Sequence, residues 1–356
     1  MKDRIYVCHT YYHVYVTFLK ELNLPKEKRG QATLVLSSLS TRFENLKERV
    51  ESTKLFEEVL IYDEKRDFDD PMLAKWRKPK KNAISKLLQR IIFTKKYGEY
   101  AAKSVEIDYR KYKDVYVFCD TDPIGYYLNR YRIPYHALED GLNCLKYYDS
   151  ARVDNPDHFK LKVFLSNKCN LLFIQNGYGK YCIDMEVNDI SALKYSCPKY
   201  IEVPRAPLTK TLTAEDKELI LKAFVRNREE LEQRIMAAKD KEDMILILTE
   251  PLCTLDVREQ IFRDLTREYE KEGTVFLKPH PRDELDYEKL FSDYPQFDPT
   301  IPMEILNYFP GLRFKKVVSV FTETKAIEFA DEIVRLGSPF MDKYEDHEVH
   351  KLNEGI

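Results

Sequence analysis

Short apolar segments alternate with longer amphipathic ones along most of this chain, and this alternation limits its fold more than any other feature. The short segments are rich in β-branched or aromatic residues and end in polar or turn residues, which is typical of strands. Helical spacing of apolar side chains separates them, notably over 13–22 and 42–53. Such alternation predicts βαβ units and a parallel sheet covered on both faces. The expected strands are 4–8, 32–36, 58–61, 115–119 and 135–138.

The pattern restarts after residue 205. Residues 206–213 carry Pro and Thr and few large apolar side chains, and one long helix pattern over 217–239 follows a helix start at 214–216. We therefore expect two doubly wound α/β domains, 1–205 and 206–356, that face each other across a cleft and bind ligands beyond the carboxyl ends of their strands. The second set is predicted to contain strands at 244–248, 274–277 and 317–321 and helices at 258–270, 303–309 and 324–329.

Composition excludes several classes of protein. The 356 residues include 58 basic and 60 acidic side chains, and the net charge of −2 disfavours a general nucleic-acid binder. No segment approaches ~20 uninterrupted apolar residues, so we expect no membrane-spanning helix. The first residues lack the apolar core and cleavage site of a secretory signal. The seven cysteines form no CxxC pair, which is typical of reduced thiols in a cytoplasmic protein.

Residues 75–96 form a basic run with nine Lys or Arg residues and no acid. Ile84, Leu87, Leu88, Ile91 and Ile92 fall at helical spacing within it. A basic amphipathic helix of this kind is suited to peripheral contact with an anionic inner-membrane surface. The same pattern fits a solvated helix whose apolar face packs on the first domain. The sequence leaves both interpretations open.

A histidine stands at the carboxyl end of an expected strand in the run Lys278-Pro279-His280-Pro281-Arg282. The two prolines restrict the backbone of this loop and remove two N–H donors. An imidazole held there between cations is suited to protonating or binding a leaving phosphate. We expect His280 to be functional rather than a turn residue that bonds to its own loop.

Two acids and a glycine, Glu139-Asp140-Gly141, follow the expected strand 135–138. Gly141 permits a tight turn and a close ligand approach. Adjacent acids on a turn point in different directions, so one carboxylate is free to accept a proton from an attacking hydroxyl while the other orients the loop. The alternative is an Asx-type turn with solvated charges. The loops at Thr10–His13 and Asp120–Asp122 end strands of the same sheet, so the acceptor side is expected there.

Asp120-Thr121-Asp122 follows the strand at 115–119 and has the Asp-x-Asp form that holds a nucleotide-bound divalent metal. Capping of the next helix is the simpler interpretation, and we expect no metal site here. Metal ligation by histidine is not expected either, although His347 and His350, in a charged segment near the C-terminus, have metal-ligand spacing. No GxGxxG, P-loop or Gly-x-Ser-x-Gly motif occurs.

Together these motifs resemble those of glycosyltransferase family 52, the lipooligosaccharide and capsule sialyltransferases of bacteria. The resemblance rests on Glu139-Asp140-Gly141 and His280-Pro281. The segments Cys8 to His13, Thr249 to Leu252 and Pro302 to Glu304 extend it over most of the chain. It implies a two-domain GT-B fold, an inverting transfer from a CMP-sugar, most directly CMP-sialic acid, to a glycan hydroxyl, and no metal or other cofactor.

The resemblance also implies roles for individual residues. Asp140 would be the general base and His280 the general acid. Nucleotide-sugar binding would fall to Thr249, Lys278, Pro281, Glu304, Thr322 and Thr324, with the two last threonines at a helix N-terminus. The acceptor side would comprise Thr10, Tyr11, His13, Glu139 and Gly141. The sequence departs from the family at Glu323, which stands where a Ser/Thr pair is expected.

Alternatives remain at this stage. The same cleft would serve a CDP-glycerol phosphotransferase or a UDP-hexose transferase of GT-B type. A metal-dependent GT-A enzyme would use Asp120-Thr121-Asp122, although the second α/β pattern disfavours it. A non-catalytic assembly factor at a membrane surface would use residues 75–96. The acceptor, the linkage and the oligomeric state, including a homodimer, are not encoded in these patterns.

Overall fold

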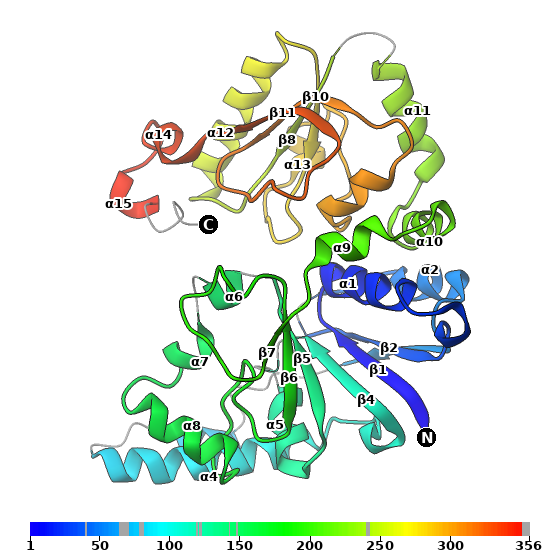
Figure 1. Cartoon of the computed structure of the whole chain (residues 1–356). Helices are drawn as coiled ribbons and strands as arrows, with labels where there is room; N and C mark the ends of the chain where they lie inside the picture. Colours follow the sequence, from blue (N-terminus) through cyan, green and yellow to red (C-terminus); the bar gives the residue numbers. More distant parts are fainter. Residues whose placement is uncertain are drawn as a thin grey trace. The chain divides into compact units, whose positions relative to one another are not determined.

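The computed structural model (Figure 1) describes residues 1–39, 41–63, 71–77, 82–118, 120, 123–141, 143–146, 149–239 and 243–350. The chain divides into two compact units, Met1–Leu212 and Thr213–Ile356. The division falls after helix α9 (Arg205–Lys210), later than the expected 205. The reason is that α9 contacts α1 (Tyr11–Leu22), where Asn23 Nδ2 donates to the Leu208 carbonyl at 3.0 Å.

The first unit is built on a seven-stranded sheet with the order β3-β2-β1-β4-β5-β6-β7. All neighbouring strands are parallel. The strands are β1 (Lys2–Cys8), β2 (Ala32–Ser37), β3 (Glu58–Tyr62), β4 (Tyr112–Phe118), β5 (Tyr135–Leu138), β6 (Cys182–Val187) and β7 (Tyr200–Glu202). This order is the doubly wound arrangement, in which the chain changes direction between β1 and β4.

Helices connect these strands. After α1 come α2 (Leu46–Thr53), α3 (Pro71–Arg77), α4 (Ala83–Ala101), α5 (Pro123–Tyr131), α6 (Asn143–Lys146), α7 (Ser150–Val153) and α8 (Phe159–Asn167), with 3₁₀ turns η1 (Lys26–Lys28) and η2 (Tyr109–Lys111). The buried core includes Ile5, Val7, Val35, Val117 and Ala137, all without solvent exposure. Such β-branched and small residues suit a sheet that is covered on both faces.

The second unit has a four-stranded parallel sheet with the order β11-β10-β8-β9. Its strands are β8 (Met244–Leu248), β9 (Thr274–Lys278), β10 (Phe314–Ser319) and β11 (Ala330–Arg335). Its helices are α10 (Ala214–Phe224), α11 (Arg228–Lys239), α12 (Leu255–Tyr269), α13 (Tyr287–Leu290), α14 (Gly337–Met341) and α15 (His347–His350), with the 3₁₀ turn η3 (Met303–Tyr308). Ile247, Leu277 and Val318 lie fully buried in its core.

The expected strands are confirmed to within a few residues, except that Cys119 lies outside the described residues. The single helix expected over 217–239 is wrong. Helix α10 ends because Val225 has an extended backbone (φ −99°, ψ 109°), and Asn227 adopts a positive φ of 46° before α11 begins. Asparagine tolerates this left-handed conformation better than most residues.

The helix expected over 324–329 is also absent. This segment is a loop whose backbone groups bond to side chains instead of to a helical ladder. Asn307 holds it from η3, because its Nδ2 donates to the Ala326 carbonyl and its Oδ1 accepts from Glu328 N, both at 2.8 Å. Thr322 and Thr324 were expected at a helix N-terminus. This expectation is wrong, because they lie in a loop that side-chain hydrogen bonds hold in place.

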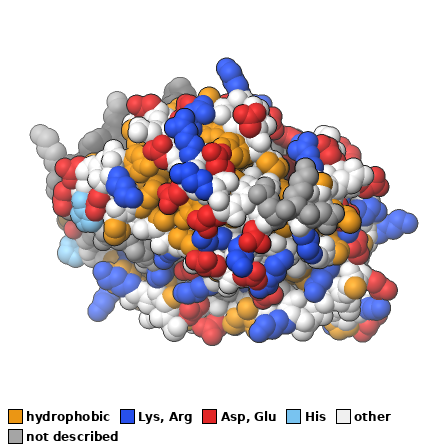
Figure 2. All heavy atoms as spheres, turned by 90° about the horizontal axis from the view of Figure 1, so that it is seen from above, with side chains coloured by type: hydrophobic (Ala, Val, Ile, Leu, Met, Phe, Trp, Pro, Cys, Tyr) orange, Lys and Arg blue, Asp and Glu red, His pale blue; other side chains and the backbone are white. Residues whose placement is uncertain are grey.

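Surface charge is mixed on the face shown in Figure 2, where Lys and Arg side chains alternate with Asp and Glu. This intermixing agrees with the small net charge of the chain. Among the described helices, none is both long and apolar enough to cross a bilayer.

Candidate functional site

The carboxyl edge of the first sheet carries the residues expected to handle the acceptor. From β1 the chain continues to β2 on one side in the sheet, and from β4 it continues to β5 on the other side. The carboxyl ends of β1 and β4 therefore form the switch point at which doubly wound folds bind ligands. His13 lies in the first turn of α1 after β1, and Asp140 is the second residue after β5.

A buried histidine contacts the expected base. His13 Nε2 bonds to Asp140 Oδ1, and His13 Nδ1 accepts a hydrogen bond from His9 N at 3.0 Å. Because Nδ1 acts as an acceptor, the proton of the neutral ring is on Nε2 and is donated to the carboxylate. The His13 side chain is 1% exposed and that of Asp140 36% exposed. Asp140 is thus anchored from inside the protein and still reaches solvent.

Packing holds this histidine in place. The His13 ring stacks on Phe118 with centroids 4.3 Å apart. Further along α1, Glu21 accepts from Arg4 Nε at 2.6 Å and from Tyr6 OH at 2.8 Å, and all three side chains are buried. A buried carboxylate paired with a guanidinium and a hydroxyl fixes α1 against β1. The position of His13 is therefore set by the fold and not by a surface loop.

The neighbours of Asp140 have structural roles. Glu139 is buried, and its Oε2 accepts from Asn188 N at 3.0 Å, while burial raises the pKa of its carboxyl. Gly141 has a φ of +90°, which a side chain would strain, although a Cβ there would meet no atom within 4 Å. The two acids thus point in different directions, with Glu139 inside and Asp140 toward solvent.

Thr10 and Tyr11 shape the start of α1. The Thr10 hydroxyl caps the helix by accepting from His13 N at 3.2 Å. The Tyr11 ring is buried and packs on Phe43 with centroids 5.5 Å apart. Of the five residues expected on the acceptor side, the structure places His13 in contact with Asp140, and Thr10 supports His13.

Asp120 is a buried structural residue. Its carboxylate accepts from Asn176 N and from Tyr135 OH, each at 2.7 Å. Burial raises the pKa of this carboxyl. These bonds tie the end of β4 to β5 and to the loop before β6, a role that uses both oxygens. Thr121 and Asp122, the rest of this motif, lie outside the described residues.

The carboxyl edge of the second sheet carries the His-Pro loop. His280 follows β9, is half-buried, and its backbone N donates to Thr249 Oγ1 at 3.1 Å. Its Nδ1 accepts from Arg282 N at 3.1 Å, so the ring proton is on Nε2. Burial, then the positive charges of Arg282 and Lys278, lower the pKa of His280 to about 4. At neutral pH the ring is an uncharged donor through Nε2.

A buried lysine at the end of β9 holds this loop through hydrogen bonds to backbone carbonyls. Lys278 Nζ donates to the carbonyls of Pro279 and Pro299, both at 3.1 Å. Burial lowers the pKa of Lys278 to about 8, against the opposing effect of Asp298 and Glu304. Burial also raises the pKa of Glu304, which lies in η3. A backbone hydrogen bond and the charge of Lys278 offset part of this rise. The two expected nucleotide-binding residues are therefore electrostatic neighbours.

Side-chain bonds of Asp283 and Arg258 tie the His-Pro loop to neighbouring segments. Asp283 Oδ2 accepts from Tyr287 OH at 2.9 Å, and Asp283 Oδ1 accepts from Leu285 N at 3.1 Å and pairs with Arg258. Arg258 in turn donates to the Cys253 carbonyl at 2.7 Å, in the loop after β8. These bonds support the backbone on which His280 stands. Pro281 is exposed at its tip.

A glutamate missed by the sequence analysis organises the loop after β10. Glu250 is buried, and its carboxylate accepts from the backbone N–H groups of Val320, Phe321 and Thr322 at 2.8, 2.9 and 3.1 Å. Burial raises the pKa of Glu250, and these bonds oppose the rise. The available signal was its position two residues after a fully buried strand, the same position relative to a strand that singled out Asp140.

Glu323, the departure from the family pattern, has a local partner. Its Oε1 accepts from Thr324 N at 3.1 Å and from Lys325 N at 3.3 Å. The carboxylate therefore uses amide groups that would otherwise be open to an anion. Thr322 is half-buried and Thr324 buried in this loop.

A cavity of about 550 Å³ lies elsewhere in the first unit. Lys20, Asn23 and Leu24 line it at the end of α1, with Arg4 from β1. Because α1 starts at the carboxyl edge of the sheet and ends away from it, this cavity is separate from the Asp140 site.

Comparisons with known proteins bear on the fold and the family. The sequence profile of glycosyltransferase family 52 matches residues 81–334. An uncharacterised protein of Haemophilus influenzae is 25% identical over 204 residues, which make up 50% of this chain and 65% of that protein. The match thus spans less than two thirds of that relative.

Two solved structures are similar to the whole chain. The GT-B domain of a sialyltransferase from Photobacterium damselae has a TM-score of 0.53 at 14% identity, covering 99% of this chain and 97% of that domain. An α/β-galactoside α-2,3-sialyltransferase from Photobacterium phosphoreum has a TM-score of 0.51 at 14% identity, covering 93% and 90%. This likeness confirms the expected GT-B fold. Since the family profile matches most of its length, the chain belongs to glycosyltransferase family 52.

Proposed function

We propose that this protein is an inverting, metal-independent glycosyltransferase that moves sialic acid from CMP-sialic acid to a hydroxyl of a glycan acceptor. The acceptor class is a lipooligosaccharide or capsule-type polysaccharide, as the family resemblance implies. The observation that carries the proposal is the buried His13 that donates to the solvent-accessible Asp140 at the carboxyl edge of the first sheet. A carboxylate with one oxygen anchored and the group still exposed is suited to accept a proton from a substrate.

In the proposed reaction, Asp140 takes the proton of the acceptor hydroxyl as that oxygen bonds to the anomeric carbon of the donor. The bond from this carbon to the phosphate oxygen breaks, and CMP leaves with the electron pair. A single displacement by an oxygen inverts the anomeric centre. His13 acts as a positioning residue, because it bonds to Asp140 and is itself almost fully buried.

On the donor side, His280 presents a neutral Nε2–H, which stabilises the departing phosphate by a hydrogen bond. This assigns His280 a donor role in place of the full proton transfer expected of a general acid. CMP leaves as an anion that is stable without a further proton, so a preorganised donor is sufficient. In this proposal Thr322 supports the phosphate with its hydroxyl, and Glu304, whose charge acts on Lys278, binds the ribose.

The nucleotide preference separates this proposal from its alternatives. Because a ligand that binds the native state raises the melting temperature by mass action, CMP should raise it more than UMP, UDP or CDP at equal concentration. The test measures the change in melting temperature with each of the four nucleotides, both with and without EDTA. A largest shift with UDP would favour a UDP-hexose enzyme, and one with CDP a CDP-glycerol phosphotransferase. Loss of the CMP shift in EDTA would contradict metal independence.

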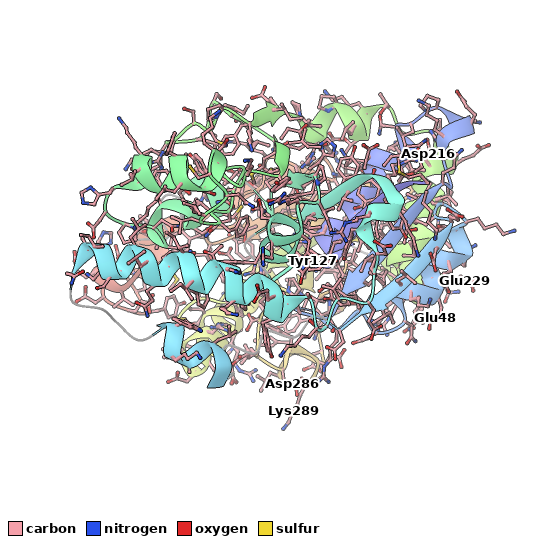
Figure 3. The ribbon with its side chains drawn as sticks, turned by 90° about the horizontal axis from the view of Figure 1, so that it is seen from below. Glu48, Tyr127, Asp216, Glu229, Asp286 and Lys289 are labelled. Atoms are coloured by element: carbon pink, nitrogen blue, oxygen red, sulfur yellow. The ribbon has the colours of Figure 1, made fainter. Side chains whose placement is uncertain are left out.

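We further propose that the protein binds the anionic cytoplasmic face of a membrane through α4 and α8. The end of α4 packs on its own unit, where Tyr97 contacts Tyr126 with ring centroids 4.8 Å apart. Its beginning instead exposes Ile84, Leu88 and Ile92, at 75%, 54% and 37%. Four-residue spacing puts these side chains on one face of the helix. Figure 3 shows α4 in cyan as a long helix on the side seen from below.

Helix α8 extends this surface, because Leu161 and Phe164 are also exposed and Lys162 is near the basic residues of α4. Burial, followed by the charges of Arg90 and Lys86, lowers the pKa of Lys162. Lysine and arginine around exposed apolar side chains complement anionic lipid. Trp76, in contrast, is half-buried beside α4, where its carbonyl accepts from Gln89 Nε2. Residues 78–81 of the basic run lie outside the described residues.

Co-sedimentation with vesicles measures this contact. We expect binding to anionic vesicles at low salt and release at high salt, because charge attraction decays over ~10 Å at 0.1 M. Leu88→Ser should weaken binding, whereas Met236→Ser, which changes an exposed apolar residue on α11, should not. Equal binding to neutral and anionic vesicles, or none to either, would contradict contact of the α4–α8 surface with anionic lipid.

A further inference from the structure

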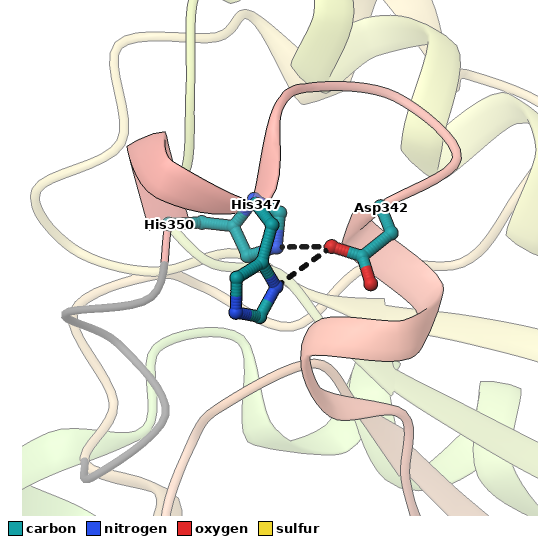
Figure 4. A group of neighbouring side chains, drawn as sticks. All are labelled: Asp342, His347 and His350. Atoms are coloured by element: carbon teal, nitrogen blue, oxygen red, sulfur yellow. Dashed lines mark hydrogen bonds and ion pairs between the residues drawn. The ribbon is translucent and has the colours of Figure 1, made fainter.

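We propose that Asp342, His347 and His350 form a binding site for a zinc-type divalent metal ion, separate from the transfer chemistry. His347 Nδ1 and His350 Nε2 each lie 3.0 Å from Asp342 Oδ1 (Figure 4). One ligand atom from each of the three residues lies within 4.8 Å of the others. Tetrahedral ligands at about 2 Å from zinc are separated by roughly 3.3 Å, so the observed arrangement needs a small adjustment to hold the ion.

The local structure explains why these side chains converge. His347 and His350 are three residues apart on α15 and therefore share a helix face. Asp342 caps the end of α14, where its N donates to the Ser338 carbonyl at 2.9 Å. The intervening turn is closed by Glu345 N, which donates to the Met341 carbonyl at 3.1 Å. Backbone bonds thus bring the face of α15 to the end of α14.

A second observation, the environment of His350, points to a metal rather than to a surface ion pair. Its side chain is 1% exposed, and its Nε2 points at Asp342. The other ring nitrogen, Nδ1, lies buried without a hydrogen bond, 3.4 Å from Glu345 Oε1. Metal-binding histidines usually direct their second nitrogen to a carboxylate, which fixes the ring and its tautomer. Glu345 is placed for this outer role.

The donor set selects the class of ion. Two imidazole nitrogens and one carboxylate suit zinc, nickel or cobalt, whereas magnesium and calcium prefer oxygen ligands throughout. Asp342 and His347 are about half exposed, so an ion has access and a fourth position is open to water. Such an ion would crosslink α15 to α14.

A crosslink between α15 and α14 would also affect the loop after β10, because His350 contacts that loop. The His350 ring lies beside Phe321, with centroids 6.4 Å apart. Phe321 N is one of the groups held by Glu250, next to Thr322. An ion that orders α15 therefore supports the loop that carries Thr322. Glu250 holds Thr322 N without help from the ion, so the ion adds stability to this loop and is not required for CMP binding or for the proposed transfer step.

Titration of zinc into the full chain, stripped with a chelator, tests the site by calorimetry and by melting temperature. We expect one ion per chain, a higher melting temperature with zinc, and no such effect of magnesium. His347→Ala changes an exposed residue, so the fold should persist, and it should lower zinc affinity at least as much as loss of an outer partner does, roughly 10- to 100-fold. Glu345→Gln should fall within that range.

His158→Asn provides the matched control, because His158 is exposed, stands in the first unit and has a left-handed backbone that asparagine accepts. This variant should bind zinc as the unaltered protein does. Equal zinc affinity in His347→Ala and the unaltered protein would overturn the proposal, as would the absence of a bound ion in both. Nucleotide-induced thermal shifts in metal-free protein report on the transferase proposal independently of this result.

Discussion

Replacing Asp140 with asparagine should lower turnover by ~10²–10⁴-fold, the range for loss of a general base. The amide keeps the size of the side chain, and its oxygen still accepts the hydrogen bond from His13 Nε2, so the loop should retain its shape. What disappears is the ability to take a proton from the acceptor. Because the base acts on the acceptor, CMP affinity should change little. Steady-state rates and CMP titration measure the two effects separately.

The matched control is Asp108→Asn. Asp108 is an exposed carboxylate that precedes β4 at the opposite edge of the first sheet, where it caps η2. It should leave both turnover and CMP affinity unchanged. If Asp140→Asn keeps nearly normal turnover, Asp140 is not the general base. If the variant binds CMP much more weakly, Asp140 contacts the donor nucleotide and not only the acceptor.

His280→Ala is expected to lower both turnover and CMP affinity, by roughly 10- to 100-fold for a hydrogen bond to a charged group. The Nε2–H that alanine lacks is the donor proposed to meet the phosphate. His280→Gln, which offers an N–H at the end of a side chain of similar length, should recover part of the affinity. Equal CMP affinity in His280→Ala and the unaltered protein would contradict contact with the phosphate.

The same residue has a pH signature. The pKa of His280 is lowered from 6.5 to about 4 in the folded chain, mainly by burial. Between these values the unfolded chain binds a proton that the folded chain does not, so stability falls as pH falls. Urea unfolding at about pH 7 and about pH 5 should therefore show a smaller acid-induced loss for His280→Ala than for the unaltered protein. A larger loss in the variant would mean that the pKa is raised instead.

How much of this the sequence predicted depended on how locally each feature is encoded. Buried strands such as β1 and β8 were found because their apolar runs are continuous. Strand β6 was missed because Asp184 and Glu186 interrupt its apolar pattern, and β11 because half of its residues are charged and most of them are exposed. In each of these two strands a neighbouring strand, rather than local composition, determines the extended backbone.

The candidate site residues show the same difference between features encoded locally and features set by distant parts of the chain. Asp140 and His280 could be proposed from sequence because each closely follows a strand and stands beside residues with special backbone preferences, Gly141 in one loop and two prolines in the other. The contact between His13 and Asp140 joins residues 127 positions apart, and no local pattern encodes it. The helix expected after Thr324 was wrong because Asn307 and Glu323 satisfy that segment's backbone groups, a long-range and a local competition that apolar spacing does not report.

Release of CMP from CMP-sialic acid, with and without a galactosyl acceptor and with EDTA present throughout, is the decisive measurement for a sialyl transfer in which Asp140 is the base. We expect acceptor-dependent release and a sialylated product in the unaltered protein, with both nearly lost in Asp140→Asn. Absence of CMP release with any sugar acceptor, or equal release by Asp140→Asn and the unaltered protein, would contradict it.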